Sequence, residues 1–95
     1  MIDFNVIKKL TALDSKTLIE RALKLSEENG EVSEAILSYV KANGCEYKNK
    51  TKEDVIEECL DVIIVASSII SQVNDNVDVE HIYKCKLKKW EEKCK

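Results

Sequence analysis

Residues 51–73, which read TKEDVIEECLDVIIVASSIISQV, decide the class of fold. The β-branched residues in this stretch would also suit a strand. However, the apolar pattern continues for more than 20 residues without glycine or proline, which far exceeds the length of a strand. The stretch begins at Thr51 with a sequence that resembles a capping box, with Asp54 in place of the usual glutamate. We therefore predict a long helix that ends near Val73 and that, being apolar around much of its circumference, is the most buried of the chain.

Three more helices are predicted around this one. A short opening helix covers residues 4–10, whose apolar side chains recur over two helical turns. Asp14 or Ser15 offers an N-cap for a long amphipathic helix, and Gly44 is placed to end it in a left-handed conformation. Asp78 caps the last helix. Polar loop and turn segments are predicted at 45–50 and 74–76. The fold class is therefore all-α: a small helical bundle of three main helices plus the short N-terminal one.

The bulk composition limits what the chain can be. Its 95 residues are expected to form a single domain, 1–95, and a core of this size is marginal, so burial against a partner chain would help. The longest apolar run, 62–66, is too short to span a bilayer or to form a signal-peptide core. No two of the four cysteines have Cys-x-x-Cys spacing, and the net charge of −3 argues against a broad nucleic-acid surface. We expect a cytoplasmic protein that contacts neither membrane nor nucleic acid.

Acidic side chains interrupt the two central helices in a way that needs an explanation. Glu28 and Glu31 are three residues apart, and so are Glu58 and Asp61, so each pair projects from one face of its helix. Like charges at this spacing repel, and a mid-helix glycine such as Gly30 costs about 1 kcal/mol relative to alanine. Asp61 lies between strongly apolar neighbours, where an unpaired buried carboxylate would be heavily penalised. A bound cation would resolve the conflict, and Gly30 would let a ligand or a facing helix approach.

The chemistry of these ligands favours a hard cation. Magnesium takes oxygen ligands and usually joins one or two carboxylates to substrate phosphates, so four carboxylates are enough for more than one ion. Di-iron bundles use Glu-x-x-His motifs, and neither acid pair has histidine at that position. His81 and Cys85 are four residues apart in the last helix but have no nearby third ligand for zinc. We therefore predict Mg²⁺, with Mn²⁺ as the substitute, rather than iron or zinc.

The two acid pairs also resemble the motifs of a known family. Glu-x-x-Glu at 28–31, a 26-residue spacer and Glu-x-x-Asp at 58–61 resemble the MazG-like all-α nucleotide pyrophosphohydrolases. The segment 27–36, EENGEVSEAI, looks like the Glu-Glu-x-Gly-Glu-x-x-Glu-Ala signature of that family, and 57–62, EECLDV, looks like its second motif. The resemblance covers roughly residues 15 to 90.

This resemblance implies a specific activity. Family members bind magnesium and hydrolyse nucleoside triphosphates between the α and β phosphates, giving a monophosphate and pyrophosphate. They usually form homodimers or homotetramers whose subunits complete a helical bundle. The positions that match the catalytic, metal-binding acids are Glu28, Glu31, Glu58 and Asp61. Glu27 and Glu34 are close enough in sequence to orient these ligands or the attacking water, and no single carboxylate is identified as the base.

Candidates for substrate binding come from the last helix and from the end of the first long one. Lys84 and Lys88 share a helix face and could neutralise part of a triphosphate, although a solvated lysine face at a helix C-terminus is the simpler interpretation. Tyr39 and Trp90 could stack on a base, although aromatic residues at helical spacing more often belong to a core. Two other functions stay open: a phosphoribosyl-ATP pyrophosphohydrolase, and a non-catalytic helical interaction module whose acids form a solvated face.

Overall fold

The computed structural model describes residues 2–45 and 48–95, and within these ranges all regular secondary structure is helical. The prediction of an all-α fold with three main helices and a short leading one is confirmed. The helices are α1 (Phe4–Leu13), α2 (Leu18–Tyr39), α3 (Lys52–Val73) and α4 (Val79–Lys93). In the described part of the chain, no helix is sufficiently long and apolar to span a membrane.

Two of the predicted N-caps are confirmed. The amide N–H of Asp54 donates to Thr51 Oγ1 at 3.3 Å, and that of Thr51 donates to Asp54 Oδ2 at 2.8 Å, which completes the capping box of α3. The hydrogen bonds that Asp54 Oδ2 accepts from the Thr51 N–H and then from the Thr51 hydroxyl lower the pKa of Asp54. At the start of α4, Asp78 Oδ1 accepts from the amide of His81 at 3.0 Å. Both helices therefore begin where short-range hydrogen bonding predicts.

The predicted start of α2 is wrong by two or three residues. Its N-cap is Thr17, whose hydroxyl accepts from the amide of Glu20 at 3.1 Å, while Glu20 Oε1 accepts from the amide of Thr17 at 2.9 Å. Asp14 instead ends α1, which is longer than predicted. The reciprocal pair at Thr17 and Glu20 satisfies two free N–H groups, whereas an N-cap at Asp14 or Ser15 would have no glutamate three residues later.

The predicted end of α2 at Gly44 is also wrong. The helix ends at Tyr39, and Lys41 takes the left-handed conformation with φ of 58°. The amide of Ala42 then donates to Leu37 O at 2.9 Å, the bond that closes a Schellman motif. Gly44 does have positive φ, 87°, but in the following loop, of which residues 46–47 lie outside the described ranges.

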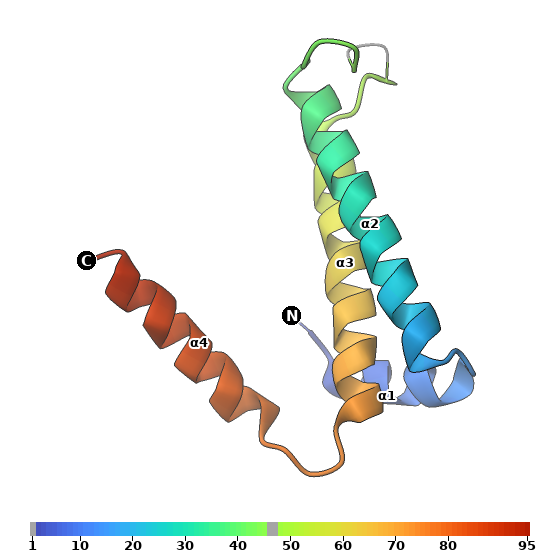
Figure 1. Ribbon diagram of the computed structural model, residues 1–95, viewed down its shortest axis with the longest axis vertical. Helices are drawn as coiled ribbons and strands as arrows, with labels where there is room; N and C mark the ends of the chain where they lie inside the picture. Colours follow the sequence, from blue (N-terminus) through green and yellow to red (C-terminus); the bar gives the residue numbers. More distant parts are fainter. Residues whose placement is uncertain (1, 46–47) are drawn as a thin grey trace.

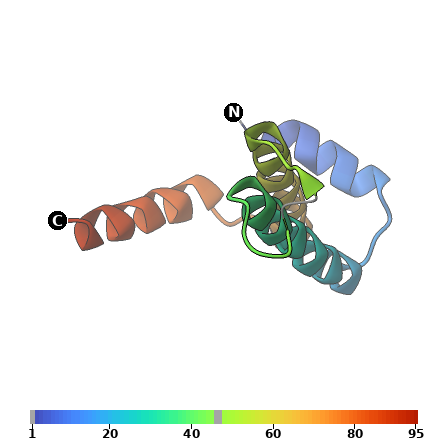
Figure 2. The ribbon, with the colours of Figure 1, turned by 90° about the horizontal axis from the view of Figure 1, so that it is seen from above.

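The helices α2 and α3 lie side by side and antiparallel, and α1 crosses near the end where α2 begins (Figure 1). The central helix is α3, since it packs against both α1 and α2. The prediction that α3 is the most buried helix is confirmed only for its central position, since α3 has one fully buried residue, Ser67, whereas α2 has four. In the described part of the chain, α4 packs against no other helix and projects away from the rest (Figure 2).

Candidate metal centre

The predicted acids converge where α2 and α3 face each other. Carboxylate oxygens of Glu28, Glu58 and Asp61 all lie within 4.8 Å of one another. A second group, Glu27, Glu28 and Glu31, meets the same limit along α2. Glu28 belongs to both groups, so five carboxylates form one continuous cluster, which we call the acid cluster. The packing of the two helices brings together all four acids that the sequence singles out.

The innermost carboxylates of the acid cluster are incompletely satisfied. Glu28 is only 6% exposed, and one of its oxygens, Oε1, accepts a salt bridge from Lys24 Nζ at 3.0 Å. Its other oxygen, Oε2, is buried and has no hydrogen-bond partner among the described residues. The same holds for Glu58 Oε2 on α3. A buried charged oxygen without a partner costs several kcal/mol, so a further positive group bound at the acid cluster would stabilise it.

The electrostatics of the cluster show the same excess of negative charge. The neighbouring Glu58, to which a protonated Glu31 can hydrogen-bond, raises the pKa of Glu31, and the charge of Glu28 raises it further. The pKa of Lys24 is also raised, first by its bond to Glu28 and then by Glu27. Without a cation, Glu31 therefore holds its proton more tightly than an isolated glutamate would.

One expectation about this site is wrong. Asp61 was predicted to be buried because its sequence neighbours are apolar, but the structure exposes it. Its neighbours Leu60 and Ile64 are themselves 39% and 53% exposed, so an apolar stretch of sequence is not a buried one here. The interior face of α3 is turned toward α1 and α2, and Asp61 lies at the edge of that face. The buried carboxylate is Glu28, supplied by the other helix.

The residues present fit a hard divalent cation. All donors in the two groups are carboxylate oxygens from acids, which is the ligand type that magnesium prefers. Two oxygens bound to the same magnesium ion lie within about 4.2 Å of each other, since each bond is about 2.1 Å long. Oxygens at adjacent octahedral positions lie only about 3.0 Å apart, so the side chains of a group that spans up to 4.8 Å would have to move closer together to bind one ion. Glu28 and Glu58, with their unpartnered oxygens, are the ligands that the arrangement favours most.

The remaining predicted site residues lie elsewhere. Glu34 pairs with Lys48 of the loop after α2, and so is directed away from the acid cluster. Tyr39 ends α2, eleven residues beyond Glu28, which is about 16 Å along a helix. Within one chain, the structure does not bring the three α4 candidates to the acid cluster, because α4 projects away from α2 and α3; these are Lys84, Lys88 and Trp90. Lys84 forms an ordinary helix-surface pair with Glu80 at 3.3 Å.

Two basic residues that the sequence analysis missed lie next to the site. Lys24 is one helical turn before Glu28, and its i, i+4 spacing was the available signal. Arg21 is 4% exposed and donates to the carbonyls of Asp14 at 2.7 Å and Thr11 at 3.3 Å, which fastens the end of α1 to α2. No sequence signal distinguished Arg21 from a surface arginine.

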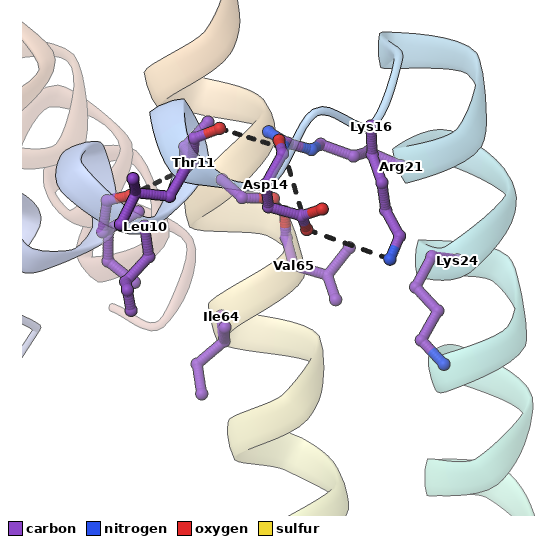
Figure 3. A pocket seen from close by; sticks show the side chains of 11 residues that line it. Leu10, Thr11, Asp14, Lys16, Arg21, Lys24, Ile64 and Val65 are labelled. Carbon is purple, nitrogen blue, oxygen red and sulfur yellow. Dashed lines mark hydrogen bonds and ion pairs between the residues drawn. The ribbon is translucent and has the colours of Figure 1, made fainter.

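Both basic residues line a pocket of about 440 Å³ beneath α1. Figure 3 shows its walls: Leu10 and Thr11 from α1, Arg21 and Lys24 from α2, and Ile64 and Val65 from α3. Its size is in the range of small-molecule sites, and it combines apolar wall surface with six polar or charged lining residues, including Arg21 and Lys24. Because Lys24 lines the pocket and also contacts Glu28, the pocket and the acid cluster are neighbours.

Comparisons of the chain with models of known protein families, with curated proteins and with solved structures found no match. The resemblance to the MazG-like family therefore stays a prediction, and the functional argument depends on the geometry of the acid cluster and its pocket.

Proposed function

We propose that this protein is a magnesium-dependent nucleoside triphosphate pyrophosphohydrolase. One observation supports this most strongly: Glu28 Oε2 on α2 and Glu58 Oε2 on α3 are buried, unpartnered and part of one acid cluster. A solvated acidic face would not leave carboxylate oxygens buried without partners. The resemblance of the two acid pairs to MazG-like motifs adds the reaction and the substrate class.

In this proposal, each part of the site has a separate task. Glu28, Glu31, Glu58 and Asp61 would hold the magnesium, which would supply charge neutralisation for the phosphate chain and a lowered pKa for the attacking water. Attack breaks the bond from the α-phosphorus to the oxygen that bridges to the β-phosphorus, and pyrophosphate leaves. Lys24 keeps Glu28 oriented and adds positive charge beside the phosphates.

The neighbouring pocket gives the proposal a place for the rest of the substrate. Its apolar wall surface between α1 and α3 suits a nucleoside, and Lys24 lies between that pocket and the acid cluster. A nucleotide with its nucleoside in the pocket would direct its phosphates toward the carboxylates. The lysines and Trp90 of α4 could reach such a substrate only from another copy of the chain, since α4 does not contact its own α2 or α3.

A nucleotide panel tests this function. Purified protein is incubated with Mg²⁺ and canonical, modified and signalling nucleotides, including phosphoribosyl-ATP, and pyrophosphate release is measured. In ¹⁸O-labelled water, the label should appear in the monophosphate, because water attacks the α-phosphorus. Glu58→Gln should abolish release, and Glu57→Gln, an exposed neighbour outside the acid cluster, should not. Release from phosphoribosyl-ATP alone would favour the alternative function of a phosphoribosyl-ATP pyrophosphohydrolase, and no release from any nucleotide would contradict the hydrolase proposal.

A further inference from the structure

The helix α2 carries a second exposed surface on the side opposite the buried Glu28. Seven residues at alternating spacings of four and three form one line along the helix, and all are exposed. The four large ones have exposed fractions of 75%, 67%, 46% and 61% in chain order. We call this line the α2 seam; it consists of Ile19, Leu23, Ser26, Gly30, Ser33, Leu37 and Val40.

The α2 seam is free of charge although the helix as a whole is not. At 100° per residue, the exposed or partly exposed charged side chains of α2 fall on a separate strip beside the seam. That strip consists of Glu20, Lys24, Glu27, Glu31 and Glu34. An uncharged line that runs the full length of a charge-rich helix is typical of a helix face that packs against another helix.

The order of residues along the α2 seam is symmetric about Gly30. Leucine occupies the seam positions seven residues on either side, Leu23 and Leu37, and serine occupies those four before and three after, Ser26 and Ser33. The outermost positions hold Ile19 and the C-cap residue Val40, which are both β-branched. In a two-fold contact, residue i of one copy meets residue j of the other and the reverse, so the surface must complement itself. The symmetric α2 seam can complement itself in this way. Binding to an unrelated partner would not require a symmetric order of residues.

Gly30 itself has no role in the packing of its own chain. A Cβ atom built there would meet no described atom within 4 Å, so α3 is not the helix that needs the glycine. Mid-helix glycine costs about 1 kcal/mol relative to alanine, and close approach of another backbone is a common reason to accept it. Ser33 can be buried in such a contact, because its hydroxyl already donates to the carbonyl of Asn29 at 3.3 Å.

The exposed area of the chain is larger than a monomer of its size should have. The chain exposes 7619 Å² and has a mass of 10.8 kDa. A compact monomer of that mass exposes about 5,500 Å², so the excess is about 2,100 Å², and a standard interface needs about 800 Å² from each partner. The radius of gyration is 16.0 Å, against about 12.4 Å for a compact chain of this length, and the projecting helix α4 contributes to both excesses. Among the described residues, Ala35 is the only buried hydrophobic one.

We propose that the α2 seam is the docking surface for a second copy of this chain. The two α2 helices cross antiparallel at a two-fold axis through Gly30, where the absence of side chains lets the backbones approach. The larger residues then pack toward the ends, Leu23 of each copy against Leu37 of the other. The seam lies on the opposite side of α2 from the buried Glu28, with Glu27 and Glu31 on the strip beside it, and the proposal does not depend on the catalytic function.

The first test compares the association of Gly30→Leu with that of the wild type by sedimentation equilibrium. In an isolated helix, leucine at this position should raise helix stability. In the proposed dimer, the added side chain should separate the helices and weaken dimerisation about tenfold or more. Circular dichroism verifies that the variant is folded. The matched control is Glu57→Leu, an equal-sized side chain at an exposed position of α3, which should dimerise as the wild type does.

A second test fixes the register. In a background with Cys45, Cys59, Cys85 and Cys94 replaced by serine, Gly30→Cys should form an intermolecular disulfide under mild oxidation, because the two copies of residue 30 lie at the axis. Glu57→Cys in the same background should not. A wild type that stays monomeric at every concentration tested would overturn the proposal. A dimer that Gly30→Leu leaves unchanged and that Gly30→Cys does not cross-link would also overturn it, and would point to another face, such as that of α4.

Discussion

Replacing Glu58 with glutamine should make the protein more stable without magnesium and less stable than the wild type with it. Glu58 has an oxygen within 4.8 Å of one from Glu28, and its own Oε2 is buried without a partner. Two unit charges 4.8 Å apart, which is the upper limit for this pair, repel by about 3.5 kcal/mol at an effective dielectric constant of about 20. Lys24 offsets part of the charge of Glu28, and Glu58 is only half-buried, so the actual repulsion is smaller. We expect the removal of the Glu58 charge to raise the free energy of unfolding by about 2 kcal/mol.

The effect of magnesium has the opposite sign. An ion present at about a hundred times its Kd stabilises the folded state by about 2.7 kcal/mol. The wild type should gain this amount, and Glu58→Gln, which lacks one ligand and one charge, should gain little. For a chain of this size, 1 kcal/mol corresponds to about 4–8 °C in Tm. The variant should therefore melt about 8–16 °C above the wild type in EDTA, and below it in saturating magnesium.

Differential scanning fluorimetry at one protein concentration, with and without magnesium, measures this inversion. Glu57→Gln is the matched control, because it removes the same charge from the adjacent position on α3 outside the acid cluster. It should leave both the stability in EDTA and the gain with magnesium close to those of the wild type. If Glu58→Gln behaves like Glu57→Gln in EDTA, the repulsion inferred from the geometry is absent. If Glu58→Gln keeps the full magnesium gain, Glu58 is not a ligand.

Three further predictions test other parts of the structure. Arg21→Met should destabilise the protein by about 2–3 kcal/mol in urea unfolding, because the carbonyls of Thr11 and Asp14 lose their hydrogen-bond donor. A change of less than about 0.5 kcal/mol would show that these two hydrogen bonds do not stabilise the fold. In EDTA, the Tm of the wild type should fall as the pH rises above 4.5. The folded state binds the proton of Glu31 more tightly than the unfolded chain does, and the stabilisation that this proton provides is lost as the pH passes the raised pKa of Glu31. Glu31→Gln should flatten this dependence, and equal slopes in the two proteins would refute the assignment. Thr51→Ala should cost about 1 kcal/mol by removing the cap of α3, with Thr51→Ser as the control that retains it.

The helices of this protein could be predicted from its sequence because their signals are local. A hydroxyl or carboxylate followed three residues later by an acid, as at Thr51 and Asp54, determines a helix start through hydrogen bonds within one turn. Where two local signals competed, the prediction failed. Asp14 and Ser15 were plausible caps for α2, but the reciprocal bonds of Thr17 and Glu20 satisfy more backbone donors.

The acid cluster was predictable for the same reason, in part. Spacings of three place Glu28 with Glu31 and Glu58 with Asp61 on single helix faces, whatever the rest of the fold does. The contact between the two pairs depends on how α2 packs on α3, and only the structure shows that Glu28 meets both Glu58 and Asp61. The roles of Lys24 and of the pocket likewise depend on α1 and α3, which are distant in sequence.

The sequence by itself determined the helical class, the caps of α3 and α4 and the spacing of the acids, since each follows from interactions within a few residues. Only the tertiary structure decided which carboxylate is buried. Sequence patterning favoured Asp61, but burial depends on which face of a helix another helix covers, and Asp61 stays exposed at the edge of the contact between α2 and α3 while Glu28 is buried in it. The tertiary structure also decided that Gly30 faces open space rather than α3. A residue's neighbours along the chain describe the composition of its helix, whereas its solvent exposure is set by the helices packed around it.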